Sequence, residues 1–172
     1  MGKFIFILGG ARSGKSAYAQ ARAKEQSKNV VYIATAQSGD SEMKKRITSH
    51  IRKRPRHWKT IEEPLNLTGA LESRVGNAEV IIIDCLTLFL SNLMMAGMKT
   101  PKIQKTVKEL GRLIAGLPYT VYLVANEVGL GIVPENKMAR DFRDIAGLAN
   151  QVMARNADEV ISMQAGIPVR IK

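Results

Sequence analysis

The sequence has one cysteine, few aromatic residues and no long apolar run. Because Cys85 is the only cysteine, a disulfide within the chain and a zinc site made of cysteines are excluded. Aromatic residues make up 5% of the chain, and no basic tail or stacking motif is present, which argues against binding of single-stranded nucleic acid. No apolar run approaches the length of a membrane span and no signal peptide is recognisable, so we expect a cytoplasmic protein without a membrane span.

Acidic residues are scarce relative to basic ones. The chain has 15 Asp and Glu against 26 Lys and Arg, which gives a formal net charge of +11 and favours anionic ligands. A nucleotide substrate and a solvated basic surface explain this charge more economically than nucleic acid, which we do not expect as a partner. The length of 172 residues and the hydrophobic content of 45% predict a single α/β domain over residues 1–172.

An apolar segment at residues 4–8 leads directly into a glycine-rich loop at residues 9–16, called the phosphate loop below. The loop fits the pattern G-x-x-x-x-G-K-[S/T], and an alanine-rich run with good helix propensity follows it. Its glycines allow backbone N–H groups to approach phosphate oxygens at the start of that helix. We expect Lys15 to contact the β- and γ-phosphates and the Ser16 hydroxyl to ligate Mg²⁺.

Other apolar segments predict further strands of a mostly parallel sheet with helices between them. The segment 79–84 ends in Asp84, which is the form of a Walker B aspartate that contacts the metal or its water shell. Residues 159–171 predict a terminal hairpin that adds an antiparallel edge, and residues 99–102 predict an exposed turn at Pro101. The other expected strands cover residues 30–34 and 120–125. The expected helices cover residues 40–54, 65–75, 86–98, 103–114 and 139–155.

The helix expected at residues 40–54 carries a basic cluster around a histidine. The cations nearest to His50 in the sequence are Arg46, Arg52, Lys53 and Arg54. They would oppose protonation of His50, and a neutral imidazole with a free ring nitrogen can attack an α-phosphate. The same cations would stabilise phosphate charge. From the residues alone, however, a solvated helix with an incidental histidine is the simpler interpretation. His57, outside this helix, is expected to be structural.

A long loop at residues 126–136, called the 126–136 loop below, follows the strand expected at 120–125. Loops of this length in compact domains are usually functional. The strand should deliver Asn126 and Glu127 to the active edge of the sheet. Whether these two side chains organise a metal or a second substrate stays open.

These motifs together resemble one enzyme family, the bifunctional adenosylcobinamide kinase/adenosylcobinamide-phosphate guanylyltransferases of cobalamin nucleotide-loop assembly. The matching segments span nearly the whole chain. They are Gly-Gly-Ala-Arg-Ser-Gly-Lys-Ser at 9–16, Ile-Ala-Thr at 33–35, Arg46 and Ile47 with His50, Asp-Cys-Leu-Thr-Leu at 84–88, Ser-Asn-Leu at 91–93, Asn-Glu-Val-Gly at 126–129, Gly-Ile-Val-Pro-Glu-Asn at 131–136, and Ala139 and Arg140 with Phe-Arg-Asp at 142–144. The resemblance implies a three-layer α/β fold of the RecA-like P-loop NTPase type and a homotrimer or related oligomer.

The resemblance also implies two reactions. In the first, GTP or ATP phosphorylates the hydroxyl of the aminopropanol arm of adenosylcobinamide. In the second, GTP donates GMP to adenosylcobinamide phosphate through a guanylylated histidine, and pyrophosphate is released. The matching histidine is His50. Two alternatives are a P-loop small-molecule kinase without transferase activity and a RecA-like ATPase stimulated by nucleic acid.

Carried over residue by residue, the family's site assigns catalytic roles to Lys15 and His50 and metal ligation to Ser16 and Asp84. Glu62 is the least secure assignment, because Glu63 adjoins it and either could face the ligand. Phe89 and Leu130, where relatives often carry other side chains, are expected at the corrinoid or at a subunit interface. The residues expected to bind nucleotide are Gly9, Gly10, Ala11, Arg12, Ser13, Gly14, Lys15, Ser16, Ala34, Thr35, Ala36, Ile51, Arg52, Lys53, Arg54, Glu62 and Asp84.

Overall fold

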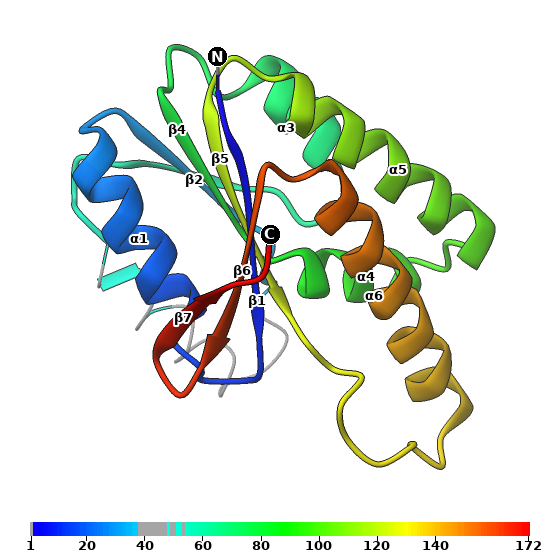
Figure 1. Cartoon of the computed structure of the whole chain (residues 1–172). Helices are drawn as coiled ribbons and strands as arrows, with labels where there is room; N and C mark the ends of the chain where they lie inside the picture. The colour runs from blue at the N-terminus through cyan, green and yellow to red at the C-terminus, as the bar shows by residue number, and fades with distance from the viewer. Residues whose placement is uncertain (1, 38–47, 49–50, 53) are drawn as a thin grey trace.

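A computed structural model describes residues 2–37, 48, 51–52 and 54–172 of the chain (Figure 1). In this part of the chain one seven-stranded sheet has the order β3-β2-β4-β5-β1-β6-β7. The strands are β1 (Phe4–Gly9), β2 (Val30–Ala34), β3 (Lys59–Glu62), β4 (Val80–Asp84), β5 (Thr120–Asn126), β6 (Glu159–Gln164) and β7 (Ile167–Arg170). All neighbouring pairs are parallel except β6 and β7, which are antiparallel. The mostly parallel sheet with a terminal antiparallel edge is therefore confirmed.

Helices cover both faces of the sheet and make three layers (Figure 1). They are α1 (Lys15–Gln26), α3 (Leu67–Ser73), α4 (Leu86–Met95), α5 (Thr100–Gly116) and α6 (Lys137–Asn156). Side chains on successive residues of a strand point to opposite faces. Accordingly Phe4 and Phe6 of β1 pack with the core beneath α3 to α6, whereas Ile5 and Ile7 pack with the core beneath α1.

The turn expected at residues 99–102 is wrong. Helix α5 already begins at Thr100, and Pro101 lies in its first turn. A proline fits there because the N–H that it lacks would have no partner within the helix, and its fixed φ is already helical. Helix α4 ends at Met95 instead of Met98, and Gly97 follows with a φ of 79°.

Most of the helix expected at residues 40–54 lies outside the described residues. Of that stretch, residues 48, 51, 52 and 54 are described; the first three are helical, whereas Arg54 lies in a bend after the helix. Among the described helices, none combines the length and the apolar character that crossing a membrane requires.

Candidate active site

The phosphate loop joins the end of β1 to the start of α1. Gly9 has a φ of 152° and Gly14 a φ of 97°, both in a region that residues with a Cβ rarely adopt. A Cβ added at Gly9 would also overlap the carbonyl oxygen of Met163 on β6. A glycine is therefore required at position 9 for both conformational and steric reasons, and the chain turns there into the loop.

Lys15 lies within the curve of this loop. Its side chain is only 6% exposed, and its Nζ donates to Gly10 O at 2.5 Å and to Ser13 Oγ at 3.4 Å. Burial lowers the pKa of Lys15, while the charges of Cys85 and Asp84 act in the opposite direction. Because an ammonium group has three N–H donors, phosphate oxygens can be added to the contacts of this lysine.

The turn between β6 and β7 packs against the phosphate loop. Gly166 N donates to Ser13 O at 3.1 Å, and a Cβ at Gly14 would be 3.5 Å from Gly166 Cα. The C-terminal hairpin thus supports the loop from outside. Sequence reasoning missed this contact, because nothing local to residues 164–166 indicates which segment the turn meets.

Asp84 ends β4 at the same edge of the sheet. The hydroxyl of Tyr32 on β2 donates to Asp84 Oδ2, and the guanidinium carbon of Arg54 lies 3.6 Å from the centroid of the Tyr32 ring. Burial, followed by the charge of Asp84, raises the pKa of Tyr32 far above its usual value, so the phenol stays a donor. Sequence reasoning named Asp84 and Arg54 but not Tyr32, which reads as an ordinary residue of a buried strand.

Ser16 and Asp84 could hold a magnesium ion. Both are half-buried, and their hydroxyl and carboxylate oxygens are the hard ligands that Mg²⁺ prefers. Across the described ranges, no group of three or more His, Cys, Asp and Glu residues could hold a metal by itself. In nucleotide sites Mg²⁺ is usually bound by one or two protein ligands together with phosphate oxygens of the nucleotide.

Hydrogen bonds fix the carboxyl ends of β2 and β4 to each other. The Thr35 hydroxyl donates to Cys85 O and accepts from Cys85 N, both at 2.8 Å. Asn92 Nδ2 donates to Thr35 O at 2.8 Å and to Pro64 O at 3.1 Å. Thr35 is fully buried, so its side chain acts here within the protein, and a contact between Thr35 and nucleotide stays a prediction. Asn92 lies in the Ser-Asn-Leu segment at 91–93 that matched the family, but this supporting role was not predicted for it.

The structure separates the two glutamates at the end of β3. Glu63 Oε1 accepts from Leu65 N at 3.1 Å and Asn66 N at 2.8 Å, and its Oε2 pairs with Arg74 at 3.0 Å. Glu63 therefore shapes the entry to α3. Glu62 is exposed at the end of β3, which favours it over Glu63 as the residue that faces a ligand.

The 126–136 loop begins beside the phosphate loop. Glu127 N donates to Gly9 O at 3.0 Å, and the Glu127 carboxylate accepts from Gly129 N at 2.8 Å. At the other end, Asn136 caps α6 by accepting from Met138 N at 2.8 Å, and Arg140 donates to Pro134 O at 3.0 Å. Between these anchors, Leu130 is 91% exposed and Ile132 is 97% exposed, so the loop presents apolar side chains to solvent.

The other residues predicted for the site have different outcomes in the structure. His50 and Lys53 lie outside the described residues, while Ile51 and Arg52 are described and exposed. His57 is exposed. The expectation that Phe89 contacts a corrinoid or another subunit is wrong, because Phe89 is buried in the core beneath α3 to α6. Gly10 and Ser13 of the phosphate loop accept hydrogen bonds from Lys15, and Ala34 pairs with Asp84 on the neighbouring strand.

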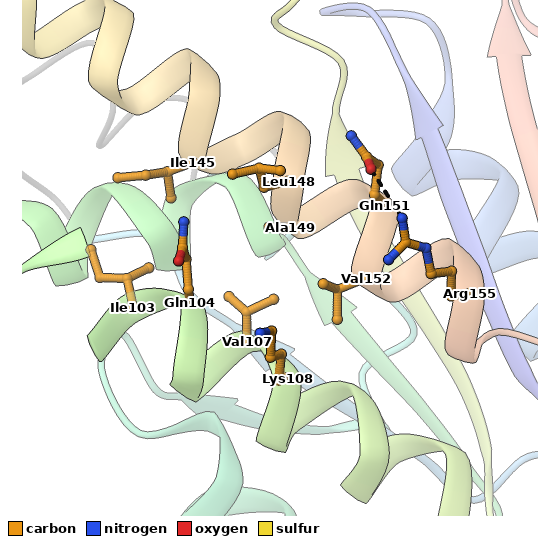
Figure 2. A pocket seen from close by; sticks show the side chains of 10 residues that line it. All are labelled: Ile103, Gln104, Val107, Lys108, Ile145, Leu148, Ala149, Gln151, Val152 and Arg155. Carbon is orange, nitrogen blue, oxygen red and sulfur yellow. Dashed lines mark hydrogen bonds between the residues drawn. The ribbon is translucent and has the colours of Figure 1, made fainter. Parts of the chain in front are cut away.

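A hollow of about 240 Å³ lies elsewhere, between α5 and α6 (Figure 2). Its walls are mainly apolar, with Val107 from α5 and Leu148 and Val152 from α6. Arg155 at its rim donates to Gln151 at 3.3 Å. Among the described residues, those that line this hollow include none of the phosphate loop and no carboxylate. It is therefore separate from the nucleotide site.

The chain is similar to a known family over almost its whole length. The family model described as cobinamide kinase / cobinamide phosphate guanyltransferase matches residues 5–171. The bifunctional adenosylcobalamin biosynthesis protein CobP of Pseudomonas aeruginosa is 42% identical over 166 residues, covering 96% of this chain and 95% of that protein. The bifunctional adenosylcobalamin biosynthesis protein CobU of Escherichia coli is 42% identical over 180 aligned residues, covering 98% and 99% of the two chains.

Two solved structures share the fold at low sequence identity. The flagellar accessory protein FlaH of Methanocaldococcus jannaschii has 18% identity and a TM-score of 0.52, covering 99% of this chain and 78% of FlaH. The RadB recombinase has 12% identity and a TM-score of 0.51, covering 93% of this chain and 73% of RadB. These likenesses support the fold alone. The α/β fold is that of the RecA-like P-loop NTPases, as predicted.

Proposed function

The chain belongs to the cobinamide kinase / cobinamide phosphate guanyltransferase family, and we propose that its phosphate-loop edge carries out both reactions of that family. It is a transferase of cobalamin biosynthesis. Adenosylcobinamide is phosphorylated first, and GMP is then transferred from GTP to adenosylcobinamide phosphate. The observation that supports this proposal best is a buried Lys15 inside a complete phosphate loop, electrostatically coupled to the Walker B aspartate Asp84.

In the kinase step, the hydroxyl of the aminopropanol arm attacks the γ-phosphorus. The bond from that phosphorus to the bridging oxygen breaks, and a nucleoside diphosphate leaves. Lys15 and the loop N–H groups stabilise the charge on the transferred phosphoryl group, which is the main catalytic demand of such a reaction. Ser16 and Asp84 would hold Mg²⁺, which when bound would neutralise phosphate charge. Either GTP or ATP fits these contacts.

In the transfer step, we assign the nucleophile to His50 by its place in the family motif. A neutral ring nitrogen of His50 attacks the α-phosphorus of GTP, and pyrophosphate leaves. A phosphate oxygen of adenosylcobinamide phosphate then attacks the same phosphorus, which releases His50 and forms adenosylcobinamide-GDP. Arg52 and Arg54, close to His50 in the sequence, supply positive charge for the leaving pyrophosphate.

The expected assembly follows from the family resemblance. We propose a homotrimer or a related oligomer. The apolar, exposed side chains of the 126–136 loop agree with a contact there to the corrinoid or to a neighbouring subunit. A cytoplasmic location stays a prediction from the sequence.

The test of the transferase half is a labelling experiment. The protein is incubated with α-labelled GTP and Mg²⁺ and denatured, and the stability of the label in acid and in alkali is measured. We expect an acid-labile, alkali-stable adduct, as a phosphoramidate requires. The chain has 2 histidines, so His50→Ala should abolish labelling and the matched control His57→Ala should retain it. A folded protein that binds GTP but never becomes labelled would leave a kinase without transferase activity.

A further inference from the structure

Tyr32 uses two separate parts of its side chain at the active edge. Its hydroxyl donates to Asp84 Oδ2, and its ring face lies under the guanidinium of Arg54, 3.6 Å from centroid to Cζ. Tyr32 is 1% exposed, so water does not compete with either contact. One buried side chain therefore contacts both the Walker B aspartate and a cation from the segment that follows His50.

The hydroxyl contact is a charge-assisted hydrogen bond. Such bonds are roughly twice as strong as those between neutral groups, and a buried tyrosine hydroxyl needs a partner. Tyr32 pairs with Ile82 on β4, and Asp84 follows two residues later at the end of that strand. The bond thus runs diagonally from the middle of β2 to the last residue of β4, and it restricts the rotation of the Asp84 carboxylate.

The ring contact is a cation–π interaction with Arg54. The Nε of Arg54 is buried and has no hydrogen-bond partner among the described residues. Stacking on the Tyr32 ring therefore contributes to the position of the planar guanidinium. Stacking of this kind depends on the flat shape of arginine and of the aromatic ring, which lysine or an aliphatic side chain would not reproduce.

We propose that Tyr32 is a positioning residue shared by the two reactions. Its hydroxyl orients Asp84 for metal binding in the kinase step, and its ring orients Arg54 for guanylyl transfer. This inference rests on the proposed function, since it assigns a separate reaction to each half of the side chain. It predicts that the two halves can be separated by substitution.

The first measurement is the affinity for a divalent cation. Mn²⁺ binding to the protein with a non-hydrolysable GTP analogue is followed by the electron paramagnetic resonance of free Mn²⁺. Tyr32→Phe removes the hydroxyl and keeps the ring, and we expect about 10-fold weaker Mn²⁺ binding, as for other residues that orient a metal ligand. The matched control is Tyr122→Phe. Tyr122 is buried on the same face, pairs with Ile82 from the other side, and donates to Gln26 at 3.0 Å.

The second measurement is the initial rate at which α-labelled GTP modifies the protein, at saturating Mg²⁺. Tyr32→Phe should label faster than Tyr32→Leu, because it retains the ring on which Arg54 stacks. Tyr32→Leu removes the ring and should label about fivefold more slowly, from the loss of one cation–π contact. Arg54→Lys keeps the charge but loses the planar stack. It should label slowly, and it tests the stacking contact should Tyr32→Leu fail to fold.

Either of two results would overturn the inference. One is wild-type Mn²⁺ affinity in Tyr32→Phe, and the other is equal labelling rates for folded Tyr32→Phe and Tyr32→Leu. A failure of the proposed function looks different, because the wild-type protein itself would then remain unlabelled. Circular dichroism of each variant separates loss of folding from loss of positioning.

Discussion

The phosphate loop and the 126–136 loop follow neighbouring parallel strands, yet they differ in what they expose. Gly9 at the end of β1 pairs with Asn126 at the end of β5, and Glu127 N donates to Gly9 O. The phosphate loop closes around a buried Lys15. The 126–136 loop is anchored at both ends but leaves Leu130 and Ile132 almost fully exposed.

This difference distinguishes the part of the site that recognises phosphate groups from the part that we expect to recognise the acceptor. Phosphate groups are recognised by backbone N–H groups and one lysine, which a single chain supplies locally. A large amphipathic acceptor such as cobinamide needs apolar protein surface to bind. In the isolated chain, the apolar side chains of the 126–136 loop are exposed to water. We therefore expect changes in the phosphate loop to abolish nucleotide chemistry, and changes in the 126–136 loop to affect the acceptor.

The largest effect is expected at Lys15. Lys15→Met removes the buried positive charge and should lower kcat for phosphorylation of adenosylcobinamide by about 10³-fold, the scale seen when one stabilising group is lost from a preorganised site. The matched control is Lys24→Met, because Lys24 lies exposed in the last turn of the same helix. A Lys15→Met enzyme within tenfold of wild type would show that the phosphate loop does not act through this lysine.

The next effect concerns the stability of the phosphate loop. Gly9→Ala combines an unfavourable φ with an overlap at Met163 O, and we expect a loss of about 1–3 kcal/mol in the free energy of unfolding. Gly10→Ala is the control, since a Cβ there would meet nothing within 4 Å. Urea denaturation of both variants measures the difference. Equal stabilities would contradict the steric argument for position 9.

A smaller and more selective effect is expected in the 126–136 loop. Ile132→Ser should raise KM for adenosylcobinamide about 10-fold, which corresponds to the loss of part of an isoleucine's burial against the acceptor, and should leave KM for GTP unchanged. Val169→Ser, at an exposed valine of β7, is the control. Should KM for GTP change instead, the proposed division between the two loops would fail. A change in sedimentation would assign Ile132 to a contact between subunits.

The last prediction concerns the reactivity of Cys85 and involves no change in the sequence. Burial, followed by the charge of Asp84, raises the pKa of this thiol to about 12. Because the folded-state pKa lies above that of the unfolded chain, the contribution of this thiol to the free energy of unfolding is fully present below about pH 9. It is lost as the pH rises toward 12. At a pH near 9, native protein should react with iodoacetamide about 10³-fold more slowly than urea-unfolded protein, following the thiolate fraction. Rapid alkylation of the folded protein would show that the active edge is open at this point.

Local patterns in the sequence predicted the elements that depend on neighbouring residues. The phosphate loop, the strand that ends in Asp84 and the terminal hairpin are all present where expected. The turn expected at Pro101 is wrong, because proline both ends helices and begins them, and local pattern alone did not distinguish these roles. The site residues His50 and Lys53 lie outside the described part of the chain.

The amino-acid sequence by itself thus determined the nucleotide chemistry of this protein, because a phosphate-binding loop needs only a strand, glycines, a lysine and a helix in a fixed order. Tertiary structure decided which strands are neighbours and what meets across them. It placed β5 between β1 and β4, brought the Tyr32 hydroxyl to Asp84, and set Gly166 against Ser13. These contacts join residues far apart in the chain, so strand order and register determine them, and no local spacing encodes either one.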